Sequence, residues 1–317
     1  MRLLHESEIK PTEIDHLGHM NVRFYMDRAQ RANKALMASF GLDKNALASG
    51  GARLVQKDSY IRYHREQFQG STLEVRGGVL QADASRLQLY FELVNDAKAQ
   101  VAATFIMSVS LVDRATRADL PVPEAALAAA ADERVTMPEH GRPRTIDLGA
   151  PRLDIVYEEL AERLSDEHSD PMSRRMQRTI KASECDEFGF LAESRDMMFG
   201  GFRMPRPEAM REAERSFGPM TFVSDDGHRF GWASLETRNV QVEQPRAGDT
   251  ICSIGAEIGL HSKVRHSRRW MFNTTTGRLV SLNDNVSVGL DLDARRTIEI
   301  PPKLRTVLES RHFPEFA

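Results

Sequence analysis

A short segment near the N-terminus combines the side-chain types that acyl-transfer chemistry needs. Residues 15–21 read DHLGHMN and run directly into a segment with the apolar spacing of an α-helix. A carboxylate, two imidazoles and a glycine therefore lie where a helix exposes free N–H groups and the positive end of its dipole. A carboxylate beside such groups can act as a nucleophile or a general base on a polarised carbonyl. An Asp in this place can also be a simple N-cap of the helix. The surrounding sequence must therefore distinguish a catalytic carboxylate from a cap.

The core of this motif recurs in the second half of the chain. Residues 185–192 read CDEFGFLA, so that Asp186 and Gly189 repeat the spacing of Asp15 and Gly18. Further matches follow in the same order: Ser-Phe-Gly at 39–41 and 216–218, a glycine before a strand at 70 and 248, and alternating rows at 101–111 and 280–290. Their shared order predicts a tandem duplication with small insertions.

The elements that must position the motif have an α+β order in each half. In the first half a strand at 2–11 precedes the motif, and apolar residues at helical spacing predict a long helix over 22–40, ended by Gly41. Strands are expected at 54–63, 72–80, 87–93 and 101–111. The second half repeats this order, with a helix at 193–217 and strands at 230–242, 250–260, 264–272 and 279–292.

The length of the chain and the positions of its prolines predict that the 317 residues form two domains and a connector. We expect an N-terminal domain at 1–115, a partly helical connector at 116–172 and a C-terminal domain at 173–317. Prolines break the connector, and an Ala-rich stretch at 124–133 is expected to be helical. Such a long connector is natural between two domains.

Composition excludes several classes of protein. A net charge of −3 is not that of an electrostatic nucleic-acid binder. The sequence contains no apolar run of about 18 residues, so no membrane-spanning helix is expected. The two cysteines stand in no metal or redox spacing, which suits a reducing compartment, so we expect a cytoplasmic protein. His16 and His19 alone are too few ligands for zinc, and neither a metal nor a cofactor is expected.

The motif resembles that of the hotdog-fold acyl-CoA thioesterases, in the 4-hydroxybenzoyl-CoA thioesterase-like branch. The signature Asp-x-x-Gly-His-x-Asn of that branch matches Asp15, Gly18, His19 and Asn21 position for position. The resemblance implies a long helix wrapped by a curved antiparallel sheet, with active sites between two such units. Here one chain would supply both units, as in the double-hotdog thioesterases.

The resemblance also implies the roles of the motif residues. Asp15 would be the nucleophile or general base on the thioester, amides near Gly18 and His19 would hold the developing oxyanion, and Asn21 would hold the turn in shape. A thioester has a good leaving group, so an oriented carboxylate and an oxyanion site suffice. The substrate would be an acyl-CoA in lipid metabolism, and edge-to-edge joining of sheets would give a homo-oligomer, with a dimer favoured.

The second copy departs from the signature. Phe190 replaces the histidine and Ala192 the asparagine, although Asp186 and Gly189 remain. We therefore expect one competent site at Asp15, with the second unit supplying the opposing wall. Asp186, Gly189 and Glu193 could still form a second, degenerate site, whereas Glu193 could equally belong to a solvated first helical turn.

Two further groups of residues could belong to a site. His261 and His266 lie among basic residues at 263–269 that could meet the phosphates of coenzyme A, but a solvated strand face is the preferred interpretation. Asp284 aligns with Phe105 in the alternating row, where it would add a polar spot to the acyl pocket or mark a surfacing strand.

Three other functions remain open. An acyl-carrier-protein (ACP) thioesterase would perform the same reaction on another thioester carrier. A hotdog enoyl-CoA hydratase would normally present Asp-x-x-x-x-His, and the spacing from Asp15 to His19 is one residue short of that. A non-catalytic acyl-CoA binding protein would use the same pocket without hydrolysis.

Overall fold

The computed structural model describes residues 1–164, 175–192, 222–223, 227 and 229–317. The chain forms two compact units, Met1–Arg144 and Thr145–Ala317, called here the first and the second unit. The predicted helix at 193–217, the match at 216–218 and Glu193 lie outside the described residues.

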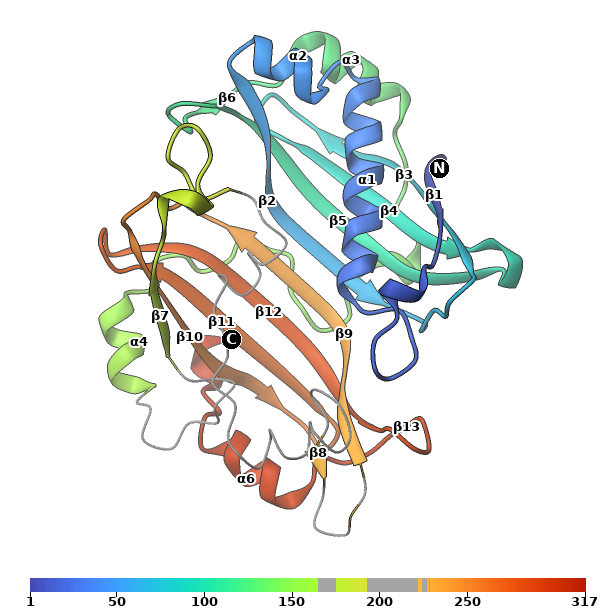
Figure 1. Ribbon diagram of the computed structural model, residues 1–317, viewed down its shortest axis with the longest axis vertical. Coiled ribbons are helices and arrows are strands. Elements are labelled where there is room, and N and C mark those ends of the chain that lie inside the picture. Colours follow the sequence, from blue (N-terminus) through green and yellow to red (C-terminus); the bar gives the residue numbers. More distant parts are fainter. Residues whose placement is uncertain (165–174, 193–221, 224–226, 228) are drawn as a thin grey trace. The chain divides into compact units, whose positions relative to one another are not determined.

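The first unit consists of one long helix and an antiparallel sheet (Figure 1). The strand order is β1-β3-β4-β5-β2. The strands are β1 (Arg2–Glu8), β2 (Ala52–Tyr63), β3 (Thr72–Ala82), β4 (Leu87–Asn95), β5 (Gln100–Asp113) and the short β6 (Asp119–Leu120), which pairs with β5. The helices are α1 (Arg23–Ser39), α2 (Lys44–Ser49) and α3 (Glu124–Asp132), with 3-10 turns η1 (Pro11–Glu13), η2 (Asp96–Lys98) and η3 (Glu139–Gly141). The predicted long helix, the strands and the helix at 124–133 are confirmed.

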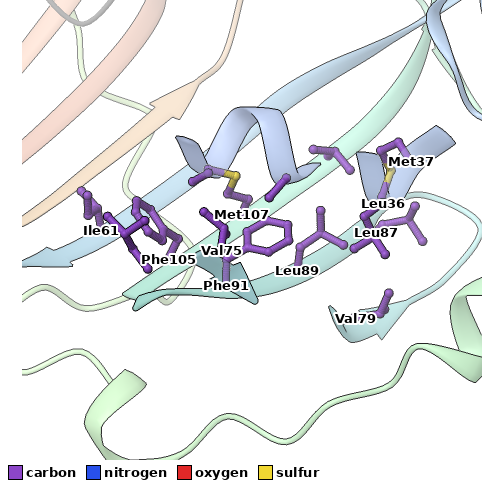
Figure 2. Packing of buried hydrophobic residues seen from close by; sticks show 14 of the residues in the cluster. Leu36, Met37, Ile61, Val75, Val79, Leu87, Leu89, Phe91, Phe105 and Met107 are labelled. Carbon is purple, nitrogen blue, oxygen red and sulfur yellow. The ribbon is translucent and has the colours of Figure 1, made fainter. Parts of the chain in front are cut away.

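Helix α1 crosses one face of this sheet and packs against β1, β3 and β4 (Figure 1). The predicted stripe is buried along its whole length, from Tyr25 to Phe40. Figure 2 shows Leu87, Leu89 and Phe91 in a row along β4, in the same apolar cluster as Leu36 of α1. Each large apolar side chain buried in this way stabilises the unit by about 1.5–3 kcal/mol. The N-terminus of α1 is thereby held on a rigid platform.

The second unit has the same strand order, β7-β10-β11-β12-β9. Its strands are β7 (Met176–Thr179), β8 (Phe222–Val223), β9 (Arg229–Gln241), β10 (Thr250–Leu260), β11 (Val264–Asn273), β12 (Arg278–Asp291) and β13 (Arg296–Thr297). Its described helices are α4 (Tyr157–Arg163) and α6 (Pro302–Glu309), with 3-10 turns η5 (Ala182–Glu184) and η7 (Pro314–Phe316). The four long strands predicted for this half are confirmed.

Irregularities in strand pairing fall at matching places in the two sheets. The register between β3 and β4 shifts after Val79, and that between β10 and β11 shifts after Glu257. The next pairs of strands shift after Leu93 and after Met271. The pairs β2–β5 and β9–β12 each contain a further shift. A β-bulge is a specific local feature, so three in the same order relate the two units residue by residue.

This correspondence corrects one alignment made from the sequence. Phe105 pairs with Phe91, and the corresponding pair in the second unit is Asn283 with Arg269. Asp284 therefore corresponds to the neighbour of Phe105 and points to the opposite face, so its alignment with Phe105 was wrong by one residue. Leu279, Val280 and Leu282 are all buried, so the apolar pattern around the bulge did not fix the register.

The corresponding faces differ in polarity. On the face of the first sheet that carries α1, the central side chains are Leu89, Phe91, Phe105 and Met107. The corresponding positions of the second sheet hold Ser267, Arg269, Asn283 and Asn285. The second unit instead places its larger described apolar cluster on the other face, where Trp270 and Leu282 pack with α4.

Among the described residues, no helix combines the length and the apolar character that a membrane span requires.

Candidate active site at the Asp15 turn

The motif at 15–21 forms a tight, closed turn ahead of α1. The N–H of Asp15 donates to the carbonyl of His19 at 2.9 Å, and the N–H of Gly18 donates to the carbonyl of Asp15 at 3.0 Å. Gly18 has φ of +81°, in the left-handed region that a glycine adopts without steric cost. The conformation of the turn therefore explains the glycine of the motif.

The C-terminal end of the turn is fixed to the core. Met20 is buried, and its N–H donates to the carbonyl of Gln67 at 2.7 Å. The N–H of Asn21 donates to the carbonyl of Glu13 at 2.9 Å. The side-chain Oδ1 of Asn21 accepts a hydrogen bond from the N–H of Arg23 at 3.2 Å, at the first residue of α1. Asn21 thus satisfies one free N–H at the start of α1, and its role of holding the turn stays a prediction.

Asp15 is not the N-cap of α1. Its Oδ1 accepts a hydrogen bond from the N–H of Leu17 at 2.9 Å and lies 3.2 Å from Nδ1 of His19. The carboxylate is 15% exposed. No hydrogen bond to its second oxygen, Oδ2, comes from the described residues. A part-buried carboxylate with one oxygen held and the other open is suited to attack or to take up a proton.

His19 lies between two carboxylates. Its Nδ1 faces Asp15, and its Nε2 lies 3.3 Å from Oε1 of Glu66. Glu66 belongs to the loop that joins β2 to β3. The sequence analysis missed Glu66, because nothing in the local sequence connects this loop with the motif.

The electrostatics of the turn favour the charged forms of both groups. Burial raises the pKa of Asp15, but the contact with His19, its charge and the N–H of Leu17 outweigh burial, so this pKa lies below its ordinary value. Burial lowers the pKa of His19, but Asp15 and then Glu66 outweigh it, so this pKa lies above its ordinary value. The carboxylate of Asp15 and the imidazolium form of His19 thus stabilise one another's charge.

Of the two amides predicted for the oxyanion, the N–H of His19 remains available. The N–H groups of Leu17, Gly18 and Met20 donate within the protein. Within the part of the chain that the structure describes, the N–H of His19 has no acceptor. Of the two amides predicted for the oxyanion, Gly18 is therefore already engaged in the turn, whereas His19 has a donor to offer.

The second copy folds into the same turn. The N–H of Asp186 donates to the carbonyl of Phe190 at 2.8 Å, and the N–H of Gly189 donates to the carbonyl of Asp186 at 3.0 Å. Gly189 has φ of +78°. The N–H of Leu191 donates to the carbonyl of Pro245 at 2.8 Å, as that of Met20 does to Gln67. The backbone of the motif is thus preserved.

The chemistry of the second copy is different. Oδ1 of Asp186 accepts hydrogen bonds from the N–H groups of Phe188 at 3.0 Å and Phe190 at 3.1 Å. The amide that is available at His19 is therefore used by the carboxylate here. The phenyl ring of Phe190 replaces the imidazole. The guanidinium carbon of Arg246 lies over this ring, 4.1 Å from the ring centroid. Gln244, whose side chain donates to the carbonyl of Leu191, takes the place of Glu66.

The basic residues of β11 do not form the solvated face that was preferred from the sequence. His266 and Arg268 lie 3.2 Å and 2.8 Å from Oδ1 of Asp284, whose side chain is 2% exposed. Burial raises the pKa of Asp284, but His266 and Arg268 outweigh it and hold this pKa low. Asp284 is therefore neither a lining of an acyl pocket nor a surface residue. It is the centre of a buried ion cluster on the face opposite to the Asp186 turn.

The described residues contain no group of three His, Cys, Asp or Glu side chains that could hold a metal ion. His16 is exposed and lies outside the contacts of Asp15 described above.

The segment that carries this site matches a known family. Residues 9–130 match the family model of the thioesterase-like superfamily. The match contains the whole motif, α1 and strands β2 to β5. In this thioesterase-like segment, one long helix packs on an antiparallel sheet, as the hotdog fold requires.

The chain is similar to proteins that are described as thioesterases. A betainyl-CoA thioesterase from Pseudomonas aeruginosa is 29% identical over 99 residues, which are 31% of this chain and 62% of that protein. The chain thus spans less than two thirds of this relative. Two solved structures resemble the chain in fold alone. A protein described as an oleoyl thioesterase from Lactobacillus plantarum has a TM-score of 0.60 and 12% identity, over 90% of this chain and 96% of its own. The 12:0-ACP thioesterase from Umbellularia californica has a TM-score of 0.63 and 10% identity, over 90% of this chain and 93% of its own.

Proposed function

We propose that the chain hydrolyses an acyl thioester and that Asp15 is the nucleophile or general base. The carboxylate of Asp15 carries this proposal, because it is held in its charged form on a rigid turn of a thioesterase-like segment. The groups around it supply what the reaction needs, since Oδ2 is open and the N–H of His19 points to no acceptor among the described residues.

Two routes use the same groups. As a nucleophile, Oδ2 of Asp15 attacks the carbonyl carbon, the C–S bond breaks, and the thiolate leaves and is protonated. Water then hydrolyses the mixed anhydride and restores the carboxylate. As a general base, Asp15 takes a proton from water as that water attacks the carbonyl; the C–S bond then breaks, and the leaving thiolate is protonated. In both routes the N–H of His19 stabilises the oxyanion, a contribution that is worth about 10²–10³ in kcat for a single donor.

One competent site is proposed for the chain. Asp186 lacks the imidazole, and its Oδ1 accepts from the amide of Phe190, which is the counterpart of the oxyanion donor. Glu193, the third residue of the possible second site, lies outside the described residues.

The architecture proposed for the chain is a double hotdog. Both sheets have the same strand order and the same bulges. In both units, a short helix after the last long strand leads into a segment that pairs with the sheet. After α3, Arg134 pairs with Val79, and after α6, His312 pairs with Glu257. This pairing favours an N-terminal domain that includes α3, beyond the predicted border at 115. The predicted dimer and cytoplasmic location remain predictions.

Substrate identity is best tested by a thiol-release screen. Short, long, branched, aromatic and trimethylammonium-bearing acyl groups would be offered on coenzyme A and on acyl carrier protein. Coenzyme A is the proposed carrier, because the relative of highest identity named above is a CoA thioesterase. Release from the protein carrier alone would favour the acyl-ACP alternative. Binding of acyl-CoA without thiol release would favour a binding protein, and hydration of an enoyl-CoA would favour the hydratase.

A further inference from the structure

Glu66 has a contact that the proposed reaction does not yet use. Its Oε1 lies 3.3 Å from Nε2 of His19, on the side of the imidazole away from Asp15. The glutamate is 40% exposed, whereas His19 is 15% exposed. A partly solvated carboxylate is thus aimed at the ring of a more buried imidazole.

The loop that carries Glu66 is fixed on both sides of this residue. The N–H groups of His64 and Arg65 both donate to the carbonyl of Ala102, at 2.9 and 3.1 Å. The carbonyl of Arg65 accepts a hydrogen bond from the phenol of Tyr25, on α1, at 3.1 Å.

The next residue, Gln67, is fully buried. Its side chain accepts from Asn95 at 2.8 Å and donates to Gln100 at 3.2 Å, while its carbonyl holds the motif through Met20. The backbone at Glu66 therefore has little freedom, so the carboxylate is preorganised toward His19.

The second copy shows that the fold of the turn does not need this pair. The turn at Asp186 keeps the backbone hydrogen bonds and the left-handed glycine. Where the first copy has His19 and Glu66, the second has Phe190 and Gln244. The imidazole and the carboxylate are thus absent together from the copy whose acidic residue accepts from the amide of Phe190. A pair that the backbone can dispense with is better explained by chemistry than by folding.

We propose that Glu66 is a positioning residue of the active site, which holds the imidazolium of His19 against Asp15. The proposal rests on the proposed function for its catalytic meaning. Glu66 fixes the ring through Nε2, so that Nδ1 faces Oδ1 of Asp15 and leaves Oδ2 for the substrate. The titratable groups that act on this ring are Asp15 on its own turn and Glu66 on the β2–β3 loop. From α1, Tyr25 contacts the same loop through the carbonyl of Arg65. Burial and then Glu66 raise the pKa of Tyr25, so its phenol stays neutral.

The direct test is the pKa of His19 in the folded protein, measured by NMR titration of the ring. Glu66→Gln removes the charge and should lower this pKa by about one unit, since a nearby opposite charge shifts a pKa by about 1–3 units and Glu66 is partly solvated. Asp119→Asn is the matched control, because it removes a surface carboxylate of the same unit that pairs with Lys57. It should leave the pKa of His19 unchanged. Equal pKa values in Glu66→Gln and wild type overturn the proposal, whether or not the protein hydrolyses thioesters.

The kinetic test connects Glu66 with the reaction. The basic limb of the kcat–pH profile should move to lower pH by about one unit in Glu66→Gln, with little change in KM, and Glu66→Asp should restore part of the shift. An unchanged profile in Glu66→Gln, with Asp15→Asn inactive, refutes the positioning role and leaves the proposed function standing. If wild type releases no thiol from any thioester, the proposed function fails, and the NMR titration alone decides whether Glu66 holds the imidazolium.

Discussion

Replacing His19 and Glu66 of the Asp15 turn by the residue types of the second copy tests whether this pair serves the reaction or the folding of the turn. The double variant His19→Phe, Glu66→Gln reproduces the side chains of Phe190 and Gln244 on the turn of Asp15. We expect this variant to fold and to lose most of its thioester hydrolysis. The second copy supports this expectation, because it forms the equivalent backbone hydrogen bonds without either side chain.

The expected loss of stability is small. The variant removes two ion-pair contacts, at 3.2 and 3.3 Å, from side chains that are 15% to 40% exposed. Such partly solvated pairs contribute about 0–1 kcal/mol each, and the phenyl ring regains part of this by burial, as Phe190 is only 4% exposed. The free energy of unfolding should therefore fall by less than about 1 kcal/mol, which lowers Tm by no more than about 4 °C in a unit of this size.

The expected loss of activity is large. Without the imidazolium, the pKa of Asp15 rises, and the amide of residue 19 becomes free to donate to Oδ1 of Asp15, as that of Phe190 does to Asp186. The site would lose both its orienting group and its oxyanion donor, so kcat should fall by at least about 100-fold. Thiol release and thermal unfolding of the same preparation measure both quantities. A variant that unfolds, or one that retains near wild-type kcat, refutes the reasoning.

Three further predictions concern the turn and its platform. Gly18→Ala should cost about 1–2 kcal/mol in urea unfolding, because φ is +81° and no atom lies near enough to add a steric term; a neutral change would contradict the left-handed turn. Phe105→Ala should cost about 3–5 kcal/mol, because the ring is fully buried in the apolar cluster of the first unit; a loss below about 1 kcal/mol would contradict its place in the core. The contribution of His19 to stability should depend on pH: because folding raises its pKa, this contribution is complete below the ordinary value of 6.5 and is lost as pH rises through the folded pKa. Urea unfolding of wild type and His19→Phe should thus differ more at about pH 5.5 than at about pH 8.5, and a constant difference would contradict the raised pKa.

Local patterns in the sequence were enough to predict most of the fold. The strands at 87–95 and 100–113 alternate or are largely apolar, and the stripe on α1 has a clean helical spacing, so these elements could be placed to within a few residues. A turn ahead of the helix followed from the motif, and the backbone there explains the types of Gly18 and Asn21. These are effects of residues close together in the chain.

Effects between distant residues could not be predicted. Glu66 reaches His19 only because Met20 binds the backbone of the β2–β3 loop, and neither sequence segment shows this. The face on which Asp284 lies depends on a bulge in β12 that the apolar pattern does not reveal. For the same reason, the charges of β11 looked like a solvated face until His266 and Arg268 were found at Asp284. Register and tertiary contact, rather than composition, decide these positions.

The most direct test of the proposed function compares Asp15→Asn with Asp186→Asn in the same thiol-release assay, on protein whose thermal unfolding matches wild type. The single-site proposal predicts that Asp15→Asn lowers kcat by at least about 100-fold while Asp186→Asn keeps the wild-type kcat. Unchanged turnover in Asp15→Asn, or an equal loss in both variants, would contradict it.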